Sequence, residues 1–314
     1  MIVPFFASSK AVYTKGELTM FDGVLYVILM IAAGYGLIRG KLLPKESTGI
    51  VSSLLMTLCF PAMILMGFLA LDPKELLHTG LTTAVITMVF SLLPALVLLL
   101  KKEKGPLHGL YSFVCGIGNV SFVCIPLLRL FLSEEAMVTV YLHVSIQDFL
   151  IWGLFHPTFA GKQSPNQWKK VLTEPCMLAV LIGLILCLLR VQLPSFLAMP
   201  MEALDACVSP LALVFLGMTL GRYGGNARWL SKTPLLYTLY KVVAYPLVIF
   251  GLLQTFLPTS EALLMAVLFG SPAPVASVIW MQRYTDDPTP AIANLIPSTI
   301  TYFLLYTPIL ILCY

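Results

Sequence analysis

Long apolar stretches alternate along the chain with short joints that are polar or rich in proline and glycine. Ten stretches are long enough for a membrane-spanning helix, since about 20 apolar residues cross the hydrocarbon core of a bilayer. The pattern therefore predicts ten transmembrane helices. They lie at about residues 21–38, 47–70, 76–100, 107–130, 135–158, 171–189, 201–223, 234–257, 261–284 and 290–313.

The composition narrows the class of protein further. Of the 314 residues, 59% are hydrophobic and 11% are charged, and the mean hydropathy is +0.92. A soluble domain carries about 25% charged residues, so the chain is predicted to be an all-α polytopic membrane protein. The cysteines lie in apolar stretches without CxxC spacing, and the histidines lack ligand spacing, so we expect no metal and no cofactor. Motifs of enzymes and of nucleic-acid-binding proteins are absent, so we expect neither function.

Basic residues predict the orientation in the membrane. Thirteen lysines and arginines fall in the joints after the odd-numbered stretches, and five fall on the opposite side. Because cytoplasmic loops are enriched in Lys and Arg, the odd joints are predicted to be cytoplasmic and both termini to face outward. A bacterial inner membrane or another plasma membrane is the expected location. Lys241 lies within the eighth stretch, and its long side chain is predicted to reach the cytoplasmic surface.

Two halves of the chain share a pattern. FPAMILMG (60–67) resembles PLALVFLG (210–217), and their prolines, Pro61 and Pro210, are 149 residues apart (210 minus 61). Two five-helix units fit this offset, and an odd number of spans makes the second unit run upside down relative to the first. The predicted organisation is an N-terminal tail at 1–20, a first repeat at 21–160, a cytoplasmic linker at 161–170 and an inverted repeat at 171–314.

Residues that weaken helices interrupt the fourth and ninth stretches at matching places. In GIGNVSFVCIP (116–126) the helix is predicted to break at Pro126. In FGSPAPVAS (269–277) it is predicted to break at Pro272 and Pro274. A single proline of this kind would be read as a kink, but two at equivalent places in a repeat favour a functional break.

Such breaks predict a binding site at mid-membrane. An interrupted helix in lipid leaves peptide groups unpaired unless protein or water satisfies them. Half-helix N-termini then attract anions, and half-helix C-termini attract cations. The two breaks are predicted to cross, with Asn119, Ser121 and Ser271 near the crossing.

Three segments together resemble the auxin efflux carrier family, namely GNVSFVCIPLL (118–128), SPLALVFLGMTLG (209–221) and SPAPVASVIWMQRY (271–284). The resemblance runs over the chain from about residue 21. It implies the ten-helix crossover fold shared with bile-acid-type sodium symporters. Helices 1, 2, 6 and 7 then form a scaffold, through which a homodimer would assemble, and helices 3–5 and 8–10 form a moving core. Plant members export an organic carboxylate, and bacterial members are associated with small carboxylates such as malate.

The same resemblance assigns individual residues. Asn119 falls on the family's crossover asparagine, Gln147 on a helix-5 glutamine that helps hold the substrate carboxylate, and Pro126 and Pro272 on the break prolines. The chain departs from the plant carriers in lacking charged residues at 76–100 and in having a short linker where many of them carry a long loop. An auxin-like substrate is therefore not expected.

Four further polar residues lie within the predicted spans. Asp148 is a candidate for proton or ion coupling because a carboxylate in the membrane is costly unless it is paired, protonated or solvated, although a structural role is open. His143, one turn before Gln147, is a second candidate, with a core histidine as the alternative. Asn294 and Ser298 lie near the repeat mates of Gln147 and could line the site or form ordinary interhelical hydrogen bonds.

The leading hypothesis is a secondary transporter, embedded in the lipid bilayer, for a small organic anion driven by a proton gradient or the membrane potential. A sodium-coupled transporter of the same fold is the alternative, with oxygens from Asp148, Asn119 and Ser271 and freed carbonyls around the ion. A membrane sensor is a third hypothesis, from a different class.

Overall fold

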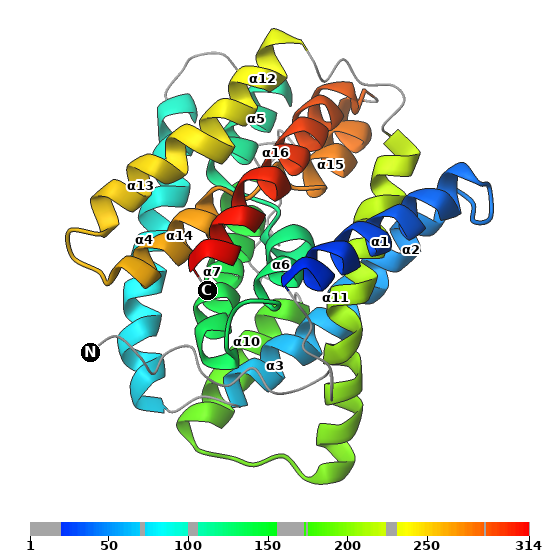
Figure 1. The fold of residues 1–314 in the computed structure, drawn as a ribbon. Coiled ribbons are helices and arrows are strands. Elements are labelled where there is room, and N and C mark those ends of the chain that lie inside the picture. The colour runs from blue at the N-terminus through cyan, green and yellow to red at the C-terminus, as the bar shows by residue number, and fades with distance from the viewer. Residues whose placement is uncertain are drawn as a thin grey trace.

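The computed structural model describes residues 20–69, 73–99, 106–155, 173, 175–223, 231–285 and 287–313, and regular secondary structure within these ranges is helical throughout (Figure 1). The first half contains α1 (Met20–Arg39), α2 (Ser47–Leu54), η1 (Leu55–Cys59), α3 (Phe60–Leu69), α4 (Pro73–Leu99), α5 (Pro106–Gly116), η2 (Val120–Cys124), α6 (Ile125–Leu128), α7 (Glu134–Leu150) and η3 (Ile151–Phe155). The second half contains α10 (Pro175–Leu188), α11 (Ser195–Tyr223), α12 (Lys232–Thr238), η4 (Leu239–Ala244), α13 (Tyr245–Leu253), α14 (Thr259–Phe269), α15 (Ala276–Thr285) and α16 (Thr289–Cys313). Residues 1–19 of the predicted tail and the predicted linker at 161–170 lie outside the described residues, and Met20 begins α1.

Within the described residues, four helical segments are long and apolar enough to cross a bilayer. They are Ser47–Leu69, Ser195–Tyr223, Lys232–Leu253 and Thr289–Cys313. A fifth span results if Leu107–Gly116 and Val120–Leu128, which meet at 48°, are counted together. Helices also fall on the other predicted stretches, but the count of ten spans and the inverted repeat stay predictions.

Wide π-helical turns precede the prolines of several helices. η1 ends two residues before Pro61, η2 two residues before Pro126, and η4 two residues before Pro246. Proline lacks the N–H that would bond four residues back, and its ring clashes with that carbonyl. A π turn relieves the clash by inserting one residue into the helical ladder, so these helices continue through their prolines.

This placement corrects the prediction that Pro126 breaks its helix. The non-helical residues are 117–119, and Pro126 lies in α6, where η2 absorbs the missing hydrogen bond. In the second half, α14 ends at Phe269 and α15 begins at Ala276, so Pro272 and Pro274 do lie in the non-helical segment.

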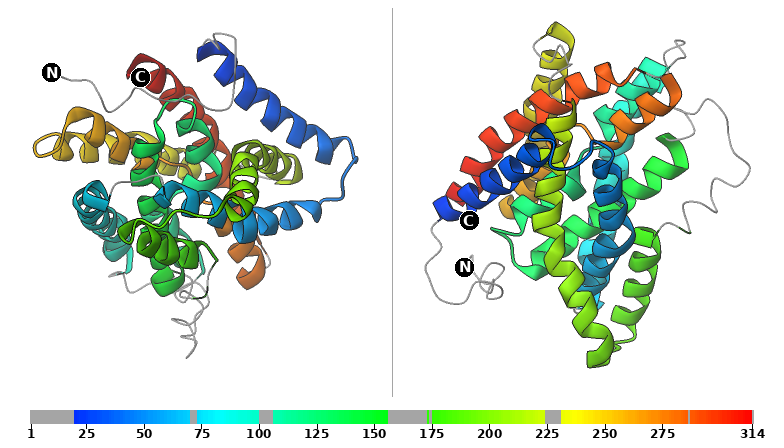
Figure 2. Two further views of the ribbon diagram at one scale, coloured as in Figure 1. Left: turned by 90° about the horizontal axis from the view of Figure 1, so that it is seen from below. Right: turned by 90° about the vertical axis from the view of Figure 1, so that its right-hand side faces the viewer.

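Glycines allow α1 and α11 to pack backbone against backbone, and these helices lie side by side in Figures 1 and 2. A Cβ added at Gly34 would lie 2.0 Å from the Val214 carbonyl oxygen, and one at Gly217 would lie 1.9 Å from the Ile31 carbonyl oxygen. α3 packs on both α10 and α11, so α1, α3, α10 and α11 form a continuous group. α4 packs on α5 and α7, α13 on α14, and α12 on α16.

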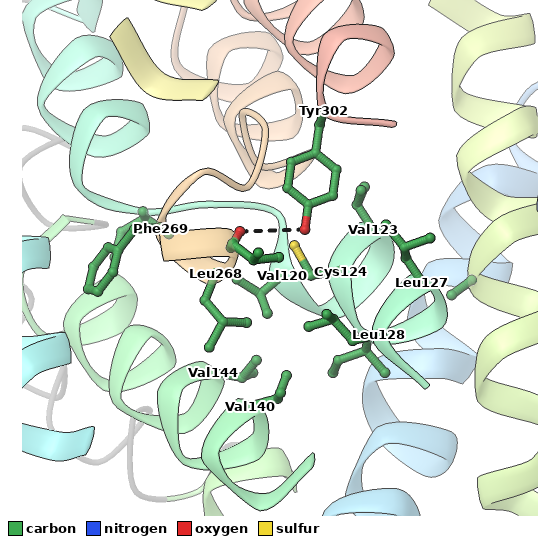
Figure 3. Close-up of a cluster of buried hydrophobic side chains, with 14 of the residues drawn as sticks. Val120, Val123, Cys124, Leu127, Leu128, Val140, Val144, Leu268, Phe269 and Tyr302 are labelled. Atoms are coloured by element: carbon green, nitrogen blue, oxygen red, sulfur yellow. Dashed lines mark hydrogen bonds between the residues drawn. The ribbon is translucent and has the colours of Figure 1, made fainter. Parts of the chain in front are cut away.

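The apolar core lies around the first break. Val120, Cys124 and Leu128 pack there against side chains of α7, α14 and α16 (Figure 3). The Tyr302 hydroxyl reaches across this cluster and donates to the Val267 carbonyl at 3.4 Å. The residues of both breaks, 117–119 and 270–275, are buried in protein.

Candidate functional site

The two helix breaks meet inside the protein. The Asn119 N–H donates to the Pro272 carbonyl at 2.8 Å, a direct backbone bond between the first and second halves of the chain. Gly118 lies beside Ser271 so closely that a Cβ on Gly118 would be 1.6 Å from the Ser271 Oγ. The predicted crossing of the breaks is thus present, and only a glycine fits at this contact.

A side chain from a neighbouring helix supports each break. Gln147 on α7 accepts the Gly118 N–H through its Oε1 at 3.4 Å, and Ser298 on α16 accepts the Ala273 N–H through its Oγ at 3.2 Å. The Ser298 hydroxyl in turn donates to the Asn294 carbonyl at 2.5 Å. These bonds satisfy peptide groups that a broken helix leaves unpaired.

Several polar atoms around the crossing have no hydrogen-bond partner among the described residues. They are the Asn119 Nδ2, the Gln147 Nε2, the Ser271 Oγ and both side-chain polar atoms of Asn294. None of the four side chains is more than 4% exposed. An unpaired buried polar group costs about 1–3 kcal/mol, so natural proteins keep such groups mainly where they serve a ligand or bind water. Three amide nitrogens and a hydroxyl supply hydrogen-bond donors suited to an anion.

Lys241 contradicts its sequence-based interpretation. Its side chain is 0% exposed, and its Nζ donates to the Cys115 carbonyl at 3.4 Å, in the last turn of α5 just before the first break. It therefore points into the protein and does not reach the surface. The sequence showed a lysine inside an apolar stretch, but only the tertiary structure shows that its side chain ends at the Cys115 carbonyl.

The other residues predicted to bind substrate or carry a proton are Ser121, Asp148 and His143. Ser121 is half-buried in η2, two residues after Asn119. Asp148 is half-buried on α7, next to Gln147. His143 is fully buried, with its Nδ1 2.9 Å from the Thr87 Oγ1. The His143 ring also packs edge to face on the Phe269 ring, with the ring centroids 4.9 Å apart, so it lies in the core beside the end of α14.

An ion pair that the sequence analysis did not identify joins the end of the first broken helix to α11. The Arg129 guanidinium contacts the Asp205 carboxylate at 2.7 Å and also donates to the Tyr141 hydroxyl at 3.1 Å. Arg129 and Asp205 are 76 residues apart, and no pattern in the sequence pairs them. Residues capable of holding a metal do not gather in groups of three anywhere in the described residues.

Comparison with known proteins gives one family. A family described as membrane transport protein matches residues 19–169 and again residues 162–311, so the two matches overlap at 162–169 and together cover almost all of the chain. Comparison with curated proteins finds no match.

Proposed function

Because the chain belongs to the membrane transport protein family, also called the auxin efflux carrier family, we propose that it is a secondary transporter for a small organic anion. The membership places the chain among integral membrane transporters, in agreement with its apolar helices. The substrate class, the driving force and the mechanism are our inference from the site.

The observation that carries the proposal is the crossing of the two breaks, where buried donors lack partners. The backbones meet at the bond from Asn119 to Pro272, and unpaired donors of Asn119, Gln147 and Ser271 lie beside it. An anionic carboxylate accepts several hydrogen bonds at once and would satisfy these donors. Lipid offers no such acceptor at mid-membrane.

The proposal includes alternating access. The side chains around the crossing are almost fully buried, so substrate reaches them only after the surrounding helices move. We assign ten spans in two inverted five-helix repeats, with both termini outside and a core of helices 3–5 and 8–10 moving against the scaffold. The tight group of α1, α3, α10 and α11 supports this division, since these helices correspond to the proposed scaffold. A homodimer would form through that group.

A proton gradient or the membrane potential is the proposed driving force. Asp148 and His143 on α7 are the candidate proton carriers, because both lie within a turn of Gln147. The bond between His143 and Thr87 would couple such a proton to α4.

Uptake into proteoliposomes tests the proposal. Purified protein is reconstituted, and labelled mono- and dicarboxylates are offered with and without a pH gradient or an imposed potential. At least one carboxylate should accumulate, and Asn119→Ala and Gln147→Ala should each lower uptake about tenfold or more, as expected for a lost hydrogen bond to a charged group.

Gln254→Ala is the matched control, since Gln254 is an exposed amide at the end of α13. It should transport at the wild-type rate. If no carboxylate moves, or if Asn119→Ala and Gln147→Ala transport as well as Gln254→Ala, the assignment of this site is wrong.

A further inference from the structure

The C-terminal end of α5 faces the first break, and its carbonyls require donors. The last four carbonyls of a helix have no partner within the helix, and they carry the negative end of its dipole. At the end of α5, the Phe113 carbonyl accepts from the Ile117 N–H at 2.9 Å. The next two carbonyls accept from side chains of helix segments α12 and η4.

Those two donors are Tyr237 and Lys241, which lie one turn apart. The Tyr237 hydroxyl donates to the Val114 carbonyl at 3.1 Å, and the Lys241 ammonium donates to the Cys115 carbonyl at 3.4 Å. In membrane transporters with broken helices, the carbonyl end of a half-helix is where a coupling cation binds. Here the ammonium group of Lys241, part of the chain itself, lies at that end.

Lys241 is held in place by a specific backbone feature. It lies in η4, the π turn that precedes Pro246. Pro246 has no N–H for the Val242 carbonyl four residues earlier, and the Tyr306 hydroxyl donates to that carbonyl at 2.9 Å. The Val242 carbonyl of the π turn therefore has a donor, and π turns often occur at functional sites.

Among the described residues, no carboxylate lies within 4.0 Å of the Lys241 ammonium. The ion pair found in this part of the chain joins Arg129 to Asp205. A buried ammonium without a counter-charge is costly, so it is retained where its charge has a use. The dipole at the end of α5 compensates part of that charge.

The second broken helix shows the contrast. The carbonyls at the end of α14 receive donors that carry no charge: Gly270 N–H to Ala266, Tyr302 hydroxyl to Val267 and Ser271 N–H to Leu268. The residue 149 positions before Lys241 is Leu92, an apolar side chain packed against the core (241 minus 149). Within the described residues, a lysine ammonium therefore lies at the carbonyl end of the first broken helix and not at that of the second.

We infer that the Lys241 ammonium takes the position of a dissociable coupling cation at the carbonyl end of α5, so that this chain works without sodium. The inference rests on the proposed transport function. It assigns the positive charge at the crossing to the protein itself, where a sodium-coupled relative would bind an ion.

Thermal unfolding of purified protein tests the inference without any substrate. Wild-type protein should unfold at the same temperature in sodium chloride and in choline chloride. Lys241→Ala removes the ammonium and leaves space at the end of α5, so it should unfold several degrees lower in choline chloride. Sodium chloride or ethylammonium chloride should restore part of that loss, because a small free cation can then enter. Lys232→Met is the matched control, since Lys232 is an exposed lysine at the start of α12, and it should show no cation dependence.

Three results would overturn the inference: sodium-dependent unfolding of the wild type, sodium-dependent uptake by the wild type, or a Lys241→Ala variant indifferent to both small cations. Should Lys241→Ala fail to fold, Lys241→Arg keeps the charge and must remain independent of sodium. Failure of the transport proposal is distinguishable, because the unfolding measurements need no transported carboxylate.

Discussion

The contact between Gly118 and Ser271 gives the sharpest test of the crossing. A Cβ added by Gly118→Ala would lie 1.6 Å from the Ser271 Oγ and 2.8 Å from the Ser271 Cβ. The hydroxyl can rotate away about its χ1 bond, but the Cβ cannot move without its backbone. The two non-helical segments must therefore separate.

The cost follows from two effects. Forcing an extra carbon into a packed interior costs about 1–3 kcal/mol. Separating the segments also weakens the 2.8 Å bond from Asn119 to Pro272, and a backbone hydrogen bond contributes about 0.5–1.5 kcal/mol net. We expect Gly118→Ala to lower the free energy of unfolding by about 2–4 kcal/mol in total.

The assay is reversible unfolding of purified protein in detergent, followed by circular dichroism. Gly36→Ala is the control, because a Cβ at this position in α1 meets nothing within 4 Å. Replacing a glycine by alanine at an open helix position stabilises a protein by about 0.4–1 kcal/mol. Ser271→Gly removes both clashing atoms, so the double variant with Gly118→Ala should recover most of the loss.

Two outcomes would refute the reasoning. Gly118→Ala could prove as stable as Gly36→Ala, which would mean that the segments do not touch as described. The loss could also persist unchanged in the double variant with Ser271→Gly, which would mean that the strain comes from another contact.

Three more predictions follow from local contacts. Tyr306→Phe should lower the free energy of unfolding by about 1–3 kcal/mol, because the buried Val242 carbonyl loses its donor, and chemical denaturation measures this. Arg129→Gln and Asp205→Asn should each destabilise the protein, and a double-variant cycle should give a coupling of about 1–2 kcal/mol that a merely solvated pair would lack. Hydrogen bonds from Thr289, the first residue of α16, lower the pKa of Asp287. Ionised Asp287 therefore stabilises the folded state above the ordinary carboxyl pKa, and this stabilisation is lost as the pH falls through the lowered pKa. Asp287→Ala should remove that part of the acid dependence in a pH series of unfolding temperatures.

Much of the site was predictable from residue types alone. Glycine, asparagine and proline inside apolar stretches predicted two broken helices, and the structure brings Asn119, Ser271 and Pro272 together at their crossing. The reason is general, since backbone unpaired within lipid must find partners in protein, and two breaks at matching depth can supply them to one another.

The exact place of the first break was not predictable. Pro126 was the strongest helix breaker in its stretch, yet the chain unwinds at 117–119 and stays helical through the proline. Local propensity could not show that the π turn η2 would let the helix continue through the proline. It also could not show that position 118 lies so close to Ser271 that a side chain there would clash. Tertiary packing overrode the local preference.

By itself, the sequence determined the all-helical membrane class, the apolar stretches and the polar residues that could bind a solute. These depend on composition and on spacing along one chain, which folding does not change. The tertiary structure decided that Lys241 points to the end of α5, that Arg129 pairs with Asp205, and which polar atoms remain unpaired. The first two depend on a neighbour more than 70 residues away, and sequence periodicity carries no information about the direction of a long side chain toward such a neighbour.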